Sequence, residues 1–433
     1  MGLFKAAGRM ARDTPEGRVR YLDFLRLLAI GVVMLGQWLM AAVILEDGDL
    51  VIDQLLAVQP WTKGATWLLQ VMPVFFFVGG WVNAASWESA QRRGTGYAEW
   101  LFRRAHRLLA PAVVFSTVWA GIALLLGRTG LDPGLIEDAT RYVGLAQWFL
   151  AVYVIVVIFV PLTTAAHRRW PLGTVGVLLV VIVVIDAAAR ADVPIVWWGN
   201  FAAVWMAVHQ LGYFWREGRF VPERRWGMWL ASGGLAAMVL LTTAGPYPVS
   251  MVGAPGDEIT NTYPPTIVLF VLGVWQLGLA VLARRPVERW LQRTRPWTAV
   301  IAGNAMVLTV FLWHLTAMVG GFGLLWALDS GFLRIEPGTA AWWLTRIPWF
   351  AFLVLLLVPL VAAFLWAERM KSPPVPAGGP IRVFLGTAFL ATAMTLFALE
   401  GFYEAQTSWG INWWAIGFLL GGEVLLRLVT RRP

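Results

Sequence analysis

The sequence predicts an all-α polytopic membrane protein, and three observations lead to that fold class. Of the 433 residues, 59% are hydrophobic and only 14% are charged. No soluble domain of this length buries so many apolar side chains with so few charged residues on its surface. Apolar runs of about 20 residues, the length that crosses a bilayer core of about 30 Å, recur along the whole chain. The chain has no Cys, which excludes a secreted disulfide scaffold.

Twelve apolar segments are predicted to be membrane-spanning helices. They cover residues 24–45, 64–85, 108–127, 143–166, 172–190, 195–214, 226–244, 263–283, 298–324, 340–366, 381–399 and 408–426. The N-terminus is not expected to be a cleavable signal, because Arg9, Arg12, Arg18 and Arg20 precede the first span and no small-residue cleavage site follows it.

The loop charges predict how these helices are oriented. If the N-terminus is cytoplasmic and the sides alternate, all but six of the 34 basic residues lie on the cytoplasmic side. The six outer residues are Lys63, Arg128, Arg141, Arg190, Arg334 and Arg346. We therefore expect both termini in the cytoplasm and a net positive inner face suited to an anionic donor. Nucleic acid is not an expected partner, because the basic residues are dispersed over short membrane loops.

A Pro/Gly-rich segment, SPPVPAGGP over residues 372–380, divides the chain. We predict a cytoplasmic N-terminal segment over 1–22, a ten-helix core over 23–366, a linker over 367–380 and a two-helix C-terminal appendage over 381–433 with a basic cytoplasmic tail. No internal repeat is evident, so an inverted-repeat transporter has no direct support.

The first span carries an informative polar pair, Arg26 near its cytoplasmic start and Gln37 further in. Eleven helical residues turn the chain through three turns plus 20°, so both side chains point along one face, about 16 Å apart. An anionic ligand could enter beside Arg26 and reach Gln37. In the alternative interpretation, Arg26 snorkels to lipid head groups and Gln37 joins two helices by hydrogen bonding.

Arg103, Arg104 and Arg107 precede the third span, at a spacing that places two or three of them on one helical face. Such clusters hold phosphate groups through charge-assisted hydrogen bonds, although an ordinary positive-inside loop has the same composition.

Four histidines remain as titratable candidates near neutral pH. His106 is placed beside the arginine cluster and His167 in a solvated loop. His209 is expected in the inner half of the sixth span, and His314 deep in the ninth span at a level similar to that of Gln37. A lone helical His is often a hydrogen-bonded core residue, but its place in the membrane favours a functional role. The chain has no metal-binding constellation, P-loop, dinucleotide fingerprint or nucleophile elbow.

Five segments together resemble the acyltransferase-3 family of integral membrane acyltransferases, in a bacterial and specifically actinobacterial type. They are RYLDFLR over 20–26, PVFFFVGGW over 73–81, RRAHRLLAP over 103–111, YPPT over 263–266 and LWHL over 312–315. The similarity covers residues 20–366. It implies transfer of an acyl group from cytoplasmic acyl-CoA to an envelope glycan or lipid, at or across the plasma membrane.

The resemblance also implies site residues. Arg26 matches the Arg of the family's first-helix Arg-x10-His motif, and Arg104 and Arg107 match an Arg-x-x-Arg element linked to the acyl donor. The motif His should stand at position 37, where this chain has Gln37. Gly79 likewise stands where the family often has Ser. Apart from acyl-CoA as donor substrate, no cofactor or metal is expected.

The exchange at position 37 bears on whether the chain is an active enzyme. Gln cannot titrate, so it cannot act as a general base, although it can position a thioester carbonyl or a hydroxyl through hydrogen bonds. His314, or second His209, would then be the base of an active acyltransferase, or the enzyme would be slow and rely on positioning of the donor alone. Alternatively, the protein is a catalytically impaired relative that binds the donor as a scaffold or carries acylated lipid. A secondary transporter is the third hypothesis. The partners expected are acyl-CoA, the envelope acceptor and membrane lipids, and the sequence does not indicate the oligomeric state.

Overall fold

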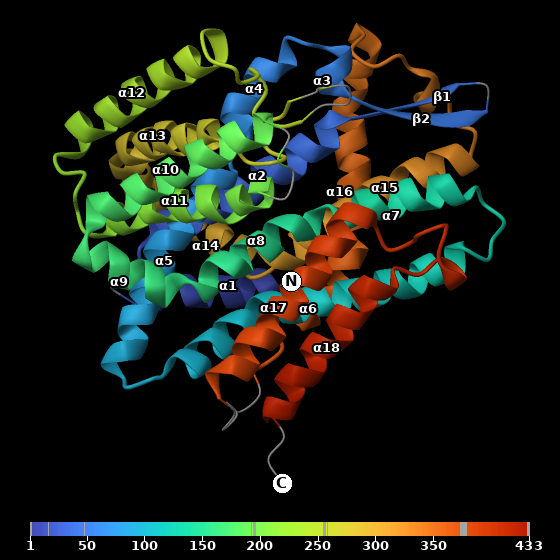
Figure 1. Cartoon of the computed structure of the whole chain (residues 1–433). Coiled ribbons are helices and arrows are strands. Elements are labelled where there is room, and N and C mark those ends of the chain that lie inside the picture. The colour runs from blue at the N-terminus through green and yellow to red at the C-terminus, as the bar shows by residue number, and fades with distance from the viewer. Residues whose placement is uncertain are drawn as a thin grey trace. The chain divides into compact units, whose positions relative to one another are not determined.

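The computed structural model describes residues 2–15, 17–46, 48–191, 193, 196–253, 257, 259–372 and 379–430. Most of these residues lie in helices, and one short hairpin contains the only strands among them (Figure 1). The described residues include ten helices or helix pairs long and apolar enough to cross a membrane, and a shorter apolar helix over Trp413–Leu426. The predicted class, an all-α multi-pass membrane protein, is confirmed.

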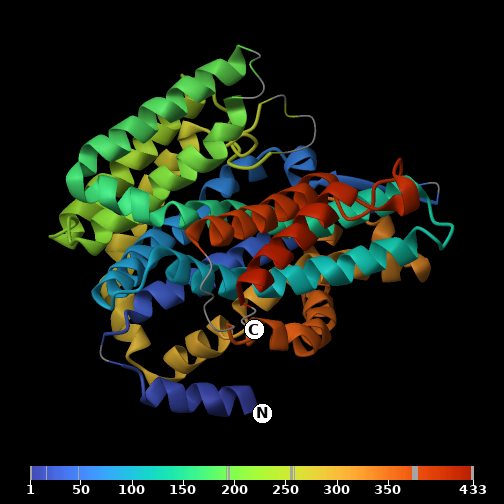
Figure 2. The same cartoon turned by 60° about the horizontal axis from the view of Figure 1, so that its bottom comes forward.

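The chain forms two compact units, of which the first comprises Met1–Ala85, Leu162–Val307 and Arg334–Leu344. Its elements are α1 (Gly2–Arg12), α2 (Arg20–Met40), β1 (Ala41–Glu46), β2 (Asp49–Gln54), α3 (Leu55–Val58), α4 (Thr62–Leu69), most of α5 (Met72–Arg92), most of α9 (Val160–Arg169), α10 (Pro171–Arg190), η1 (Val196–Trp198), α11 (Gly199–Arg216), α12 (Glu223–Thr243), α13 (Ile267–Leu291) and α14 (Thr294–Asn304). Helix α13 lies in the middle of this unit and packs against α2, α10, α11, α12 and α14. Figures 1 and 2 both show α12 and α13 side by side.

The second unit comprises Ser86–Pro161, Leu308–Leu333 and Thr345–Pro433. Its elements are α6 (Tyr97–Leu126), α7 (Pro133–Gly144), α8 (Ala146–Ile158), nearly all of α15 (Val307–Ala327), η2 (Gly331–Arg334), most of α16 (Ala340–Glu368), α17 (Pro380–Glu400), η3 (Ser408–Gly410) and α18 (Trp413–Thr430). Helix α8 is apolar on every side, and it is buried among α6, α7 and α17.

Every predicted span overlaps a helix, but several boundaries differ. The first span ends at Met40 rather than at residue 45, because the β-branched and acidic stretch that follows pairs as the β1–β2 hairpin. The predicted sixth span corresponds to α11, whose Asn200, His209 and Gln210 make it less apolar than the ten candidate spans. The division into a ten-helix core and a two-helix appendage stays a prediction. Residues 373–378 of its linker lie outside the described residues, and α17 packs against α6, α7 and α8.

The single helix predicted over 298–324 is wrong. Helix α14 ends at Asn304, a turn follows at Ala305 and Met306, and α15 begins at Val307. Gly303 and Asn304, the last two residues of α14, are both poor helix formers, and they stand where the helix is interrupted within an otherwise apolar run. Because the helix restarts at Val307, the depth of His314 counted from residue 298 no longer applies.

The new N-terminus of α15 is capped by a carboxylate from another helix. Glu368, at the end of α16, accepts hydrogen bonds from the backbone N–H of Thr309 at 2.9 Å, from its hydroxyl at 2.7 Å and from the N–H of Leu308 at 3.4 Å. These N–H groups have no carbonyl partner within α15, and a negative charge there is favoured by the helix dipole. Glu368 therefore stabilises the restart of the helix that carries His314.

Replacing Glu368 with Ala is expected to lower the free energy of unfolding by about 1–2 kcal/mol, the usual cost of losing a helix cap. Thermal unfolding of the purified protein in detergent measures it. Glu137→Ala is the control, because it removes only a surface ion pair with Arg141 and should change stability by about 0.5 kcal/mol or less. Equal unfolding temperatures for the two variants would contradict the capping role.

Candidate functional site

Arg26 and Gln37 lie on one unbroken helix, as the sequence predicts. Helix α2 runs from Arg20 to Met40, so the eleven-residue spacing aligns the two side chains along one face, about 16 Å apart. Arg26 is in the second turn, and Gln37 is half-buried next to the fully buried Trp38.

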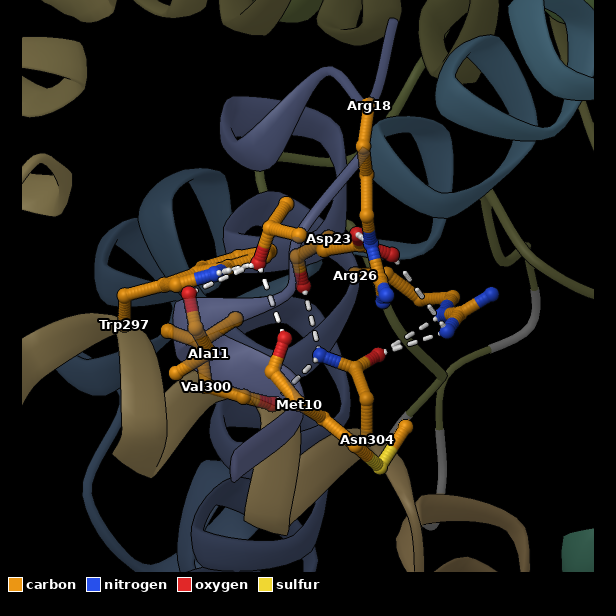
Figure 3. A network of polar contacts seen from close by, with 9 residues as sticks. Met10, Ala11, Arg18, Asp23, Arg26, Trp297, Val300 and Asn304 are labelled. Atoms are coloured by element: carbon orange, nitrogen blue, oxygen red, sulfur yellow. Dashed lines mark hydrogen bonds and ion pairs between the residues drawn. The ribbon is translucent and has the colours of Figure 1, made fainter. Parts of the chain in front are cut away.

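The guanidinium of Arg26 is bound by Asn304, the last residue of α14. Its Nε donates to Asn304 Oδ1 at 3.0 Å, and its Nη2 donates to the same oxygen at 2.7 Å (Figure 3). Two donors of the planar fork converge on one acceptor, which restrains the direction of the guanidinium more than a single hydrogen bond would.

Asn304 is itself held by two backbone carbonyls. Its Nδ2 donates to Val300 O at 2.9 Å and to Asp23 O at 3.0 Å. A carbonyl can only accept, so these two bonds require the amide nitrogen at this position and leave the amide oxygen facing Arg26. The side chain therefore has one orientation that satisfies all its partners, and it joins the end of α14 to the first turns of α2.

Among the described residues of this network there is one carboxylate, that of Asp23, and it is shared with a second arginine. Asp23 Oδ2 accepts from Arg18 Nε at 2.7 Å, whereas Asp23 Oδ1 lies 3.7 Å from Arg26 Nη2. Arg20 is nearby, since the guanidinium carbons of Arg18 and Arg20 lie 5.2 and 5.1 Å from the centre of the Trp297 ring. Among the labelled residues of Figure 3, Arg18 and Arg26 share the one carboxylate of Asp23, and this local excess of positive charge favours an anionic ligand.

The segment that precedes α2 is anchored to α14, and the first residue of α2 is anchored to the end of α13. Trp297 Nε1 of α14 donates to Thr14 Oγ1 at 2.7 Å, and Arg20 Nη1 donates to the carbonyl of Leu291, the last residue of α13, at 2.8 Å. Ala7 and Ala11 of α1 are buried in the same apolar cluster as Trp297. These contacts hold the start of α2, and with it Arg26, against α14.

The second predicted group lies on α6, within the second unit. At 100° per residue, Arg103, Arg104 and Arg107 fall within an arc of about 100° on this helix. Arg103 and Arg107 are exposed and Arg104 is half-buried, and Arg103 pairs with Glu99 at 2.8 Å. His106 points elsewhere on α6, with Nδ1 3.3 Å from the hydroxyl of Ser372. The predicted shared face is therefore present.

His314 lies in the third turn of α15 and is fully buried. Its Nδ1 is 2.5 Å from the carbonyl oxygen of Phe311, and its ring stacks on that of Phe311. Because the carbonyl can only accept, Nδ1 carries the proton in the neutral ring, and Nε2 keeps the lone pair. This is the tautomer that a histidine needs in order to take a proton at Nε2.

The other two histidines are part of the core of the first unit. His209 Nε2 lies 3.0 Å from Asn83 Nδ2, so the lone pair of that nitrogen is engaged. The prediction that His167 is a solvated loop residue is wrong: it is buried in α9, its Nδ1 lies 2.7 Å from Gln210 Oε1, and its ring packs edge-on against Tyr213. The Arg168-Arg169 pair beside it suggested a loop, but the helix turns His167 away from those residues.

Arg26 and Gln37 belong to the first unit, and the arginine cluster and His314 belong to the second. The residue that the sequence analysis missed is Asn304. The Gly303-Asn304 pair was the signal in the sequence that could have located it. The apolar residues on both sides of this pair made residues 298–324 look like one continuous span. Among the described residues, no group of three or more His, Asp and Glu could hold a metal ion.

Comparison with known proteins gives one family match. Residues 19–368 match the model of a family described as an acyltransferase domain, acyltransferase-3. The matched range contains all five segments that carry the resemblance seen in the sequence. No curated protein and no solved structure matches the chain.

Proposed function

The chain belongs to the acyltransferase-3 family of membrane acyltransferases, and from this premise we propose that it transfers an acyl group from cytoplasmic acyl-CoA to a hydroxyl of an extracytoplasmic envelope glycan or lipid. The membrane would be the bacterial plasma membrane, with both termini in the cytoplasm. Its partners are the donor, the acceptor and membrane lipids, with no nucleic acid and no metal.

The observation that carries the proposal is the arrangement around Arg26. Its guanidinium is oriented by Asn304 in a network with an excess of positive charge, and the face of α2 on which it lies leads to Gln37. Phosphate groups are bound well by oriented guanidinium forks. We assign Arg26 to the phosphates of the donor, and the family resemblance implies the same role for Arg103, Arg104 and Arg107.

His314 is the proposed general base. The acceptor hydroxyl oxygen attacks the thioester carbonyl carbon while His314 Nε2 takes the hydroxyl proton, and the C–S bond then breaks. CoA leaves as a thiolate that takes this proton from His314 Nε2, which returns the histidine to its neutral form. The hydrogen bond of Nδ1 to Phe311 O supports this role, since it leaves Nε2 as the basic nitrogen. His209, whose Nε2 lies 3.0 Å from Asn83 Nδ2, is the second candidate.

Gln37 would position the reacting groups without taking the proton. Its amide can donate to a thioester oxygen and accept from a hydroxyl. We expect Gln37→Ala to slow transfer about tenfold, the order of magnitude of one or two lost hydrogen bonds, while binding of the donor stays unchanged.

The test is an acyl-transfer assay in proteoliposomes with radiolabelled acyl-CoA donors of several chain lengths and a panel of envelope glycans and lipids. Transfer by the wild-type protein, and its tenfold loss in Gln37→Ala, are the expected results. Absence of both CoA binding and transfer would overturn the proposal.

Gln37 itself favours one alternative function, a relative that binds the donor without catalysing transfer. In that case the wild-type protein binds acyl-CoA but transfers nothing, and Gln37→His restores transfer because it supplies a titratable group. The same assay therefore separates the enzyme from a donor-binding scaffold or lipid carrier.

A further inference from the structure

We propose that Asn304 is a positioning residue that aims Arg26 at a phosphate group of the CoA donor without neutralising its charge. This inference rests on the proposed function, and it assigns a role to a residue that lies outside the family-like segments. The structure supports it by the geometry of the amide, by the charge balance around Arg26 and by the place of Asn304 at a helix end.

The first step is that the Asn304 amide is constrained before it meets Arg26. Its two donor bonds go to Val300 O and Asp23 O, carbonyls of two different helices. Rotating the amide by 180° would place its oxygen against both carbonyls and its nitrogen against a guanidinium, with all three contacts repulsive. Asn304 Oδ1 therefore presents a fixed acceptor to Arg26.

The second step concerns charge. A carboxylate in place of Asn304 would orient a guanidinium equally well, but it would also cancel its positive charge. The amide oxygen is neutral, so Asn304 orients Arg26 without placing a further negative charge beside it. Asp23 forms ion pairs with both arginines, and it lies closer to Arg18, at 2.7 Å, than to Arg26, at 3.7 Å. Arg26 therefore shares its carboxylate partner with a second cation, which weakens the competition of that carboxylate with a phosphate.

The third step is the helix break. Asn304 is the last residue of α14, so the carbonyl ends of this helix, which carry partial negative charge, lie beside Arg26. They favour the cation without binding it as an ion pair. An uninterrupted helix over 298–324 would not provide this terminus. The interruption at Ala305 and Met306 therefore places a helix C-terminus beside Arg26.

The experiment measures the dissociation constants of coenzyme A and of pantetheine, which lacks the phosphates, for the full-length protein in detergent. The variants are Asn304→Ala, Arg26→Ala, Arg26→Lys and the double variant Asn304→Ala/Arg26→Ala. Thr14→Val is the matched control, because it removes the Trp297–Thr14 hydrogen bond of the same network and does not contact Arg26. Thermal unfolding of each variant reports whether it is folded.

Asn304→Ala and Arg26→Lys are each expected to weaken coenzyme A binding about tenfold, and neither should change pantetheine binding. The double variant should bind as weakly as Arg26→Ala alone, because Asn304 acts only through Arg26. Thr14→Val should bind coenzyme A as the wild type does.

Three results would overturn the inference: coenzyme A binding unchanged in Asn304→Ala, equal losses for coenzyme A and pantetheine, or additive losses in the double variant. If Asn304→Ala does not fold, Arg26→Lys decides, since it keeps the charge but cannot present the same fork to Asn304. Full affinity in that variant would exclude an orienting role. Normal coenzyme A binding in Arg26→Ala would also overturn the inference, whereas failure of the proposed function is a separate outcome, recognised by the absence of both coenzyme A binding and acyl transfer in the wild-type protein.

Discussion

Replacing His314 with Gln is expected to slow acyl transfer by about 10²–10⁴-fold, the usual contribution of a general base. Gln is similar in size and can keep a hydrogen bond to the Phe311 carbonyl, so the packing of α15 should change little. It cannot take a proton, so the loss should appear in the maximal rate and not in coenzyme A binding. The measurement is the initial rate of acyl transfer in proteoliposomes at saturating donor.

His209→Gln is the matched control for this prediction. His209 is as buried as His314, and its Nε2 lies against the Asn83 amide, a bond that the Gln oxygen can replace. We expect a change of no more than about threefold, within the range of a conserved hydrogen bond. If His209→Gln loses activity and His314→Gln keeps it, the base is His209; if both keep it, the enzyme works by positioning alone.

The fold class and the approximate spans were predictable because they depend on composition and run length. A bilayer requires about 20 apolar residues per crossing, and that signal does not depend on which helices become neighbours. The boundaries depend on local competition. At Ala41 and Ala305 the apolar run continues after the helix has ended, so hydropathy could not locate either end.

The relative positions of site residues were predictable only where those residues lie on the same helix. The spacing of Arg26 and Gln37, and the arc formed by Arg103, Arg104 and Arg107, follow from helical periodicity. The partner of Arg26 does not, because Asn304 lies 278 residues further along the chain and reaches Arg26 only through packing of α14 on α2. His167 shows the same limit, since its partner Gln210 comes from α11.

Gly80, the second glycine of the PVFFFVGGW segment, has a packing role that the resemblance to the family did not indicate. Gly80 of α5 lies against the backbone of His209, and Gly212 of α11 lies against the backbone of Phe77 and Trp81. Two glycines therefore allow α5 and α11 to approach until their main chains touch. In a membrane, such small-residue contacts are a principal source of helix association. They also fix the part of α11 that carries His209.

Gly212→Ala is expected to lower the free energy of unfolding by about 3 kcal/mol, one of the largest effects of a single methyl group in this chain. A Cβ at this position would overlap the carbonyl oxygen of Phe77 and crowd the N–H of Trp81, and no side-chain rotation can relieve a clash with backbone atoms. The helices must separate, which loosens the packing of the neighbouring rings. Thermal unfolding in detergent and the yield of monodisperse protein report the loss.

Gly233→Ala, on α12, is the control for this prediction. Nothing lies within 4 Å of its added Cβ, and Ala favours a helix over Gly, so the unfolding temperature of this variant should stay the same or rise. Equal stability of Gly212→Ala and the wild type would contradict the backbone contact between α5 and α11.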